Sequence, residues 1–201
     1  MARSLSAEPG REHPLDAAQV AALLDIADRA IVEGLDNARP TLPAPHTLTA
    51  DLLRPVGTFV TLNVHGQLNG CIGSIQTDEA LAISVAKHAW SAAFTDPRLP
   101  ALRWIDYEHL DIEISILSPL SQTPAPSRTA LLDVLRPGVD GLLITSGARR
   151  AVFLPSVWEQ LPSPEAFLTQ LFRKAGLDPS CWPDDLRADV FTADKFARRA
   201  G

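Results

Sequence analysis

Cysteine is scarce in this sequence, with Cys71 and Cys181 the two thiols among 201 residues. They lie far apart and match neither a disulfide framework nor a zinc-binding pattern, so we expect reduced thiols in a cytoplasmic protein. Long apolar runs are also missing, because Asp, Arg, Pro or Gly interrupts every stretch before the roughly eighteen residues that a membrane span needs. The polar N-terminus lacks the apolar segment of a secretion signal. We therefore expect neither a membrane protein nor a secreted one.

Clustered positive charge and the familiar enzyme motifs are absent as well. The net charge is −6, and the basic residues form no stripe of the kind that binds phosphates, so we do not expect nucleic acid as a partner. The sequence contains no nucleotide-binding glycine loop and no HExxH, GxSxG or CxxC motif. Its five histidines show no metal-ligand spacing. The sequence thus identifies no metal site and leaves any cofactor unknown.

The periodicity of the apolar residues predicts both helices and strands. Helical spacing and capping residues mark the segments 16–35, 77–94, 130–135 and 163–176. Alternation of apolar and polar residues marks hairpins at 57–75 and 141–155 and single strands at 111–117 and 186–192. Hairpins separated by helices do not fit a doubly wound parallel sheet. We predict an α+β fold, with a mostly antiparallel sheet, flanking helices and a smaller second lobe.

The domain organisation follows from the polar ends and one proline-rich stretch. We expect residues 1–14 to be a disordered N-terminal tail, residues 15–196 to form a single domain and residues 197–201 to be a C-terminal tail. The proline-rich stretch Ser118–Ser127 can lead the chain into a small lobe within residues 118–162.

The segment most suggestive of chemistry is LNGCIG, residues 68–73, on the return strand of the first predicted hairpin. Glycines leave little bulk beside Cys71, so a ligand or a partner's backbone can approach the thiol closely. The alternative is that Cys71 is a small buried hydrophobe and that the glycines serve a bend or a bulge. If no bulge intervenes, Cys71 and Ile72 point to opposite faces of the strand.

A nucleophilic cysteine reacts as the thiolate, which a cation, an imidazole or a helix N-terminus favours. The nearest candidates in sequence are His65, His88 and Arg98, although sequence alone places none of them within hydrogen-bond reach of the sulfur. Asp96 and Arg98 flank a proline, and this spacing suits a tight turn in which Asp96 accepts from the backbone two residues on. In the other interpretation, Arg98 offers its guanidinium fork to a carboxylate or phosphate beside Cys71.

Seven segments, in order along the chain, resemble the motifs of the AMMECR-one domain family, whose bacterial and archaeal members are called AmmeMemoRadiSam system protein A. These segments are GTFVTL, LNGCIG, AAFTDPRLPAL, DIEISILSPL, DGLLI, FLPSVW and FLTQLFRKAGLDPSCW. The resemblance runs from about Leu15 to Phe196. It implies an α+β fold with a larger sheet-and-helix part, a smaller lobe and a cleft onto which the hexapeptide faces. It implies no established activity, and it leads us to expect a bacterial source.

The hexapeptide of this family usually reads LRGCIG, so this chain carries Asn69 where arginine is expected. If the family's arginine binds an anion or favours the thiolate, Asn69 cannot do so through charge, and the chain either has an altered activity or relies on Arg98. The candidate site therefore has Cys71 as nucleophile. Its candidate binding residues are Asn69, Gly70, Gly73, Asp96 and Arg98.

The resemblance also implies partners, because family members are encoded near, or fused to, Memo-like proteins related to extradiol dioxygenases and radical SAM enzymes. Two functions stay open at this point. The chain is either a cysteine-dependent enzyme or enzyme component that works with these partners on an unidentified small-molecule substrate, or a non-catalytic adaptor that docks through the LNGCIG turn.

Overall fold

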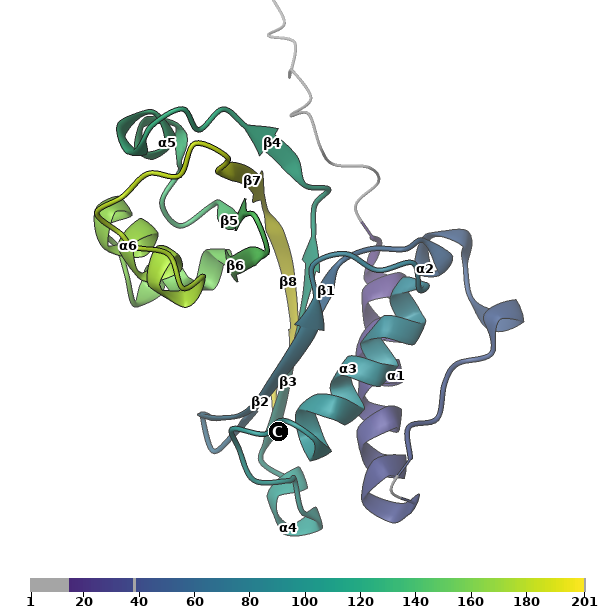
Figure 1. The fold of residues 1–201 in the computed structure, drawn as a ribbon. Helices are drawn as coiled ribbons and strands as arrows, with labels where there is room; N and C mark the ends of the chain where they lie inside the picture. The colour runs from purple at the N-terminus through teal and green to yellow at the C-terminus, as the bar shows by residue number, and fades with distance from the viewer. Residues whose placement is uncertain (1–14, 38, 201) are drawn as a thin grey trace, which may run out of the picture. The chain divides into compact units, whose positions relative to one another are not determined.

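The computed structural model describes residues 15–37 and 39–200, so the expected N-terminal tail lies outside the described residues (Figure 1). The chain forms two compact units. The first consists of the residues up to Leu117 together with those from Asp194, and the second is Ser118–Ala193. Each unit combines helices with a four-stranded sheet, which confirms the α+β prediction. The second unit extends well beyond the small lobe expected within residues 118–162.

The first unit contains two long helices, three short ones and four strands. These are α1 (Ala17–Asn37), η1 (Pro45–Thr47), α2 (Ala50–Leu53), β1 (Thr58–Val64), β2 (Gln67–Ser74), α3 (Leu81–Phe94), α4 (Trp104–Tyr107), β3 (Leu110–Leu117) and β8 (Ala193–Arg198). The strand order is β2-β1-β3-β8, so β2 is an outer strand. Helices α1 and α3 pack on each other and lie against one face of this sheet (Figure 1). Strand β8 includes Arg198, which the sequence had suggested to be part of a tail.

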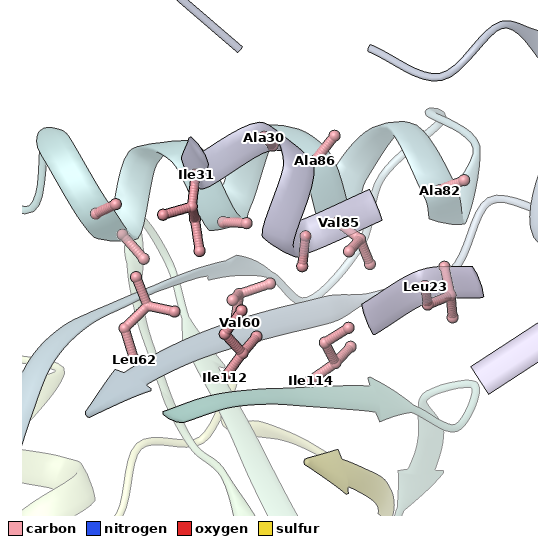
Figure 2. Close-up of a cluster of buried hydrophobic side chains, with 14 of the residues drawn as sticks. Leu23, Ala30, Ile31, Val60, Leu62, Ala82, Val85, Ala86, Ile112 and Ile114 are labelled. Carbon is pink, nitrogen blue, oxygen red and sulfur yellow. The ribbon is translucent and has the colours of Figure 1, made fainter. Parts of the chain in front are cut away.

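The core of the first unit lies between that sheet face and the two helices. Alternate residues of the strands point inward, among them Val60 and Ile114, and meet Val85 of α3 and Leu23 of α1 (Figure 2). Helix α3 presents mainly alanines to its neighbours. Because alanine side chains are short, the backbone of α3 can approach the strands closely.

Strands β1 and β2 form the predicted hairpin, with a two-residue turn at His65 and Gly66, both of which have positive φ. The register shifts at one point: Leu62 faces Gly70, whereas Asn63 faces Leu68. Asn69 is therefore the extra residue of a β-bulge. The bulge moves the side chain of Leu68 to the opposite face from that expected without one.

Beyond the bulge the alternation continues as predicted. Ile72 packs against the core, and Cys71 lies on the other face of the sheet, directly across from Thr61. The thiol is therefore on the face that α1 and α3 do not cover.

The second unit has a sheet with the strand order β4-β7-β5-β6. Its elements are β4 (Ser121–Thr123), α5 (Arg128–Val134), β5 (Gly141–Ser146), β6 (Arg149–Phe153), η2 (Pro155–Glu159), α6 (Pro164–Lys174) and β7 (Arg187–Phe191). The core combines leucines with aromatic residues, and the rings of Trp158 and Phe167 are stacked at 3.8 Å between centroids. Ser163 caps α6 as predicted, because its side chain accepts from the backbone N–H of Ala166.

No helix in the described part of the chain is long and apolar enough to cross a membrane.

Candidate functional site

Cys71 lies in the middle of β2, in strand rather than turn conformation, and its side chain is half-buried. The hydroxyl of Thr61, on the neighbouring strand, donates a hydrogen bond to the sulfur at 3.5 Å. Residues directly opposite in an antiparallel pair that exchange no backbone hydrogen bonds have their side chains close together. Thr61 was not predicted from the sequence, because a hairpin without the bulge at Asn69 would pair Thr61 with Gly70 rather than with Cys71.

Two side chains from the segment after α3 hold the backbone of Cys71. The carboxylate of Asp96 accepts from the N–H of Cys71 at 3.0 Å, and Nη2 of Arg98 donates to its carbonyl oxygen at 2.8 Å. Since β2 is an outer strand, these groups lie on the edge where no further strand pairs. Asp96 and Arg98 thus take the place that a neighbouring strand would occupy at Cys71.

Asp96 and Arg98 also form an ion pair with two parallel hydrogen bonds. Nε of Arg98 lies 2.8 Å from Oδ1 of Asp96, and Nη2 lies 2.6 Å from Oδ2. The Asp96 side chain is 1% exposed and the Arg98 side chain 61% exposed. The backbone N–H of Arg98 also donates to Oδ1 at 3.1 Å, which confirms the predicted turn.

This geometry changes the acidity of both groups. The hydrogen bond from Arg98 holds the pKa of Asp96 far below its ordinary value, with help from the N–H groups of Cys71 and Arg98, while burial acts in the opposite direction. The pKa of Arg98 is raised, chiefly by its hydrogen bond to Asp96. The Cys71 side chain raises it further. Nη2 of Arg98 donates to the carbonyl oxygen of Cys71, so the guanidinium is held against this residue at the strand edge.

The two glycines of the hexapeptide serve close packing. A Cβ at Gly70 would lie 2.0 Å from the carbonyl oxygen of Ala92, so the missing side chain lets β2 rest against α3. A Cβ at Gly73 would lie 2.3 Å from the ring of Phe59. Both glycines thus serve close packing within the first unit, and the bulge expected near them lies at Asn69.

Asn69, the bulge residue, has a buried Nδ2 atom with no hydrogen-bond partner among the described residues. Its amide is uncharged and makes no recorded hydrogen bond to Cys71 or Arg98 in the described part of the chain. Of the candidate binding residues, Asp96 and Arg98 are therefore those whose side chains reach Cys71.

The histidines lie elsewhere. His65 is exposed in the hairpin turn, where its ring stacks on that of His109 at 4.1 Å between centroids. Nε2 of His88 pairs with the hydroxyl of Ser74 at 3.2 Å. Burial lowers the pKa of His88, Glu79 opposes this change and Lys87 adds to it. Because Ser74 faces α3 and Cys71 faces away, neither histidine is a candidate base for the thiol.

The described residues contain no group of three or more His, Cys, Asp or Glu side chains that could hold a metal ion. The reactive and polar side chains that the structure brings to the site are the thiol of Cys71, the ion pair of Asp96 and Arg98, and the hydroxyl of Thr61.

Comparison with known proteins places the chain in a family. The AMMECR1 family model matches residues 24–196. A protein of Thermococcus onnurineus is 36% identical over 187 residues, covering 87% of each chain. One from Methanothermobacter thermautotrophicus is 34% identical over 189 residues, covering 91% of this chain and 96% of its own. These relatives are archaeal, so they do not support the expectation of a bacterial source.

A solved structure has the same fold. The uncharacterized protein PH0010 from Pyrococcus horikoshii superposes with a TM-score of 0.83 and 30% sequence identity, over 92% of this chain and 93% of that one. The similarity therefore extends over both units.

Proposed function

The chain belongs to the AMMECR1 family, and we propose that this member is a cytosolic thiol-dependent enzyme or enzyme component with Cys71 as its nucleophile. One observation carries the proposal: the hydroxyl of Thr61 donates to a half-buried sulfur, and the guanidinium of Arg98 is held against the backbone of the same residue. A cation and a hydrogen-bond donor favour the thiolate, which is the nucleophilic form of cysteine. The family assignment itself supplies no activity.

The roles of the surrounding residues follow from their contacts. Asp96 is a positioning residue, because its buried carboxylate fixes both the backbone of Cys71 and the guanidinium of Arg98. Arg98 supplies the positive charge that Asn69 does not carry in this chain. A group held by several hydrogen bonds keeps its orientation during a reaction, which is the condition for electrostatic assistance.

A second candidate is a non-catalytic adaptor that docks through the LNGCIG segment onto a Memo-like or radical SAM partner. The supporting observation is Leu68, which is 48% exposed because the bulge turns it away from the core. Gly70 and Gly73 contribute less to this function, since both already accommodate neighbours within the first unit. A docking surface would therefore centre on Leu68. The same partners are proposed for the enzyme component.

Alkylation kinetics test the nucleophile. The full-length protein is treated with iodoacetamide at several pH values, and mass spectrometry follows the two cysteine peptides separately. Cys181 is exposed and serves as the internal control. We expect Cys71 to react about tenfold faster than Cys181 near neutral pH, as an assisted thiolate does.

A Cys71 rate no higher than that of Cys181 and of a free model thiol at every pH would remove the nucleophile role. The adaptor is tested in parallel by co-purification with a Memo-like protein. Cys71→Ala should retain binding and Leu68→Ser should lose it, whereas retention in both variants contradicts docking through this segment.

A further inference from the structure

We propose that the Cys71 site takes small electrophiles that carry a carboxylate next to the reacting carbon, and that Arg98 selects them. This inference rests on the proposed function, since it concerns what the same thiol attacks.

The hydrogen bonds of Arg98 leave one side of its fork available. Nε and Nη2 bind Asp96, and Nη2 also binds the carbonyl oxygen of Cys71. Within the described residues Nη1 has no hydrogen-bond partner, and the side chain is 61% exposed. The carboxylate of Asp96 lies behind the guanidinium and is almost fully buried. A carboxylate arriving from solvent therefore meets the two N–H groups of Nη1, because those of Nε and Nη2 already donate to Asp96 and Cys71.

Two carboxylates on the same sheet face as Cys71, those of Glu113 and Asp111, are paired with basic side chains. Glu113 and Asp111 lie on the same sheet face as Cys71, opposite Thr61 and Asn63 of β1. Lys195 lies 3.3 Å from Glu113, and Arg199 lies 3.1 Å from Asp111. These ion pairs balance the negative charge of the face.

The reaction with such an electrophile is a displacement. The thiol has released its proton to solvent, and the thiolate sulfur forms a bond to the carbon while the leaving group departs with its electron pair. The carboxylate on the adjacent atom takes no part in bond exchange and accepts a hydrogen bond from Arg98. Holding the anion there places the carbon close to Sγ.

Iodoacetate and iodoacetamide are a matched pair for testing this selectivity, since they differ in the charge beside the reacting carbon. The rate ratio of iodoacetate to iodoacetamide is measured at Cys71 and divided by the same ratio at Cys181. We expect the normalised ratio to be about fivefold above unity, the gain typical of a partly exposed ion pair. Added salt should reduce it.

Variants then identify the selecting group. Arg98→Gln should bring the ratio to unity, and Arg98→Lys should retain part of it. Since Arg98→Gln leaves Asp96 buried without its partner, the double variant D96N/R98Q is measured as well and should also give unity. Arg149→Gln is the matched control, because Arg149 likewise donates to a backbone carbonyl, that of Gly176, within the other unit. It should leave the ratio unchanged.

A normalised iodoacetate-to-iodoacetamide ratio at or below unity in the unmodified protein overturns the inference. So does a raised ratio that both Arg98→Gln and D96N/R98Q retain. These outcomes are distinct from failure of the proposed function, in which Cys71 reacts slowly with both reagents whatever their ratio.

Discussion

The two units each contain a turn closed by an arginine and a buried aspartate, and the two turns differ in what the arginine reaches. In the second unit Nη2 of Arg136 lies 2.7 Å from Asp140, whose side chain is 3% exposed. In the first unit the corresponding distance between Arg98 and Asp96 is 2.6 Å, and Asp96 is 1% exposed. The ion pairs themselves are nearly the same.

The two ion pairs differ in the groups that surround them. Asp140 accepts from the backbone of Arg136, and its own carbonyl oxygen accepts from the indole of Trp158, so this pair joins the end of α5 to an aromatic core. Asp96 and Arg98 instead bind the N–H and C=O of Cys71. An arginine paired with a buried carboxylate is thus a general way to stabilise a turn. The chemistry proposed for Arg98 comes from the thiol beside it, and the following predictions test this difference.

The largest expected effect is on stability and should be common to both turns. Arg98→Ala and Arg136→Ala each leave a buried carboxylate without its partner. We expect each to lower the free energy of unfolding by about 2 kcal/mol, between the values for surface and buried pairs, because the guanidinium is more than half exposed in both. Urea unfolding measures this loss.

Only Arg98→Ala should also slow alkylation of Cys71, by about fivefold. Equal alkylation rates in the two variants would show that Arg98, like Arg136, acts on stability alone.

The next effect is a loss of stability at low pH. The pKa of Asp96 lies far below its unfolded value of 3.8, so its stabilisation is complete above about pH 4. As the pH falls further, the unfolded chain takes up a proton that the folded chain does not, and the free energy of unfolding decreases. Asp96→Asn should therefore flatten the decrease below pH 4 and cost about 1 kcal/mol at neutral pH. If the free energy of unfolding of Asp96→Asn decreases below pH 4 as steeply as that of the unmodified protein, the ion pair of Asp96 and Arg98 is weaker than proposed.

His88 should give a separate pH dependence at higher pH. Burial lowers its pKa from 6.5, so below about pH 6.5 the unfolded chain binds a proton before the folded chain does, and stability decreases. In His88→Gln the decrease in the free energy of unfolding below about pH 6.5 should disappear, while the decrease below pH 4 that comes from Asp96 remains. Denaturation at a series of pH values separates the two, and a slope that persists in His88→Gln must come from another group.

The smallest effect is expected at Thr61. Thr61→Val keeps the shape but removes the donor to the sulfur, so we expect alkylation of Cys71 to slow about twofold to threefold, with stability changed by less than about 1 kcal/mol. Thr61→Ser should restore the rate. If Thr61→Val reacts as fast as the unmodified protein, the hydroxyl contributes nothing to the thiolate.

Several parts of the fold were predictable because they depend on local chemistry. The alternation in β3, the caps of α6 and the turn of Asp96 and Arg98 involve residues within a few positions of one another. The bulge at Asn69 was not predictable, since an extra residue leaves no mark on composition or period. The sequence also did not mark β4, which has three residues within a proline-rich stretch.

The sequence by itself determined that the chain is α+β, that Cys71 and Ile72 point to opposite faces of a strand, and which residues are able to react. Only the tertiary structure decided that Gly70 and Gly73 accommodate Ala92 and Phe59, that Thr61 lies beside the sulfur, and that Arg98 binds the backbone of Cys71. The physical reason is distance along the chain. Period and capping are properties of neighbouring residues, whereas Arg98 reaches Cys71 across 27 positions, through the packing of α3 on the sheet and the open edge of β2.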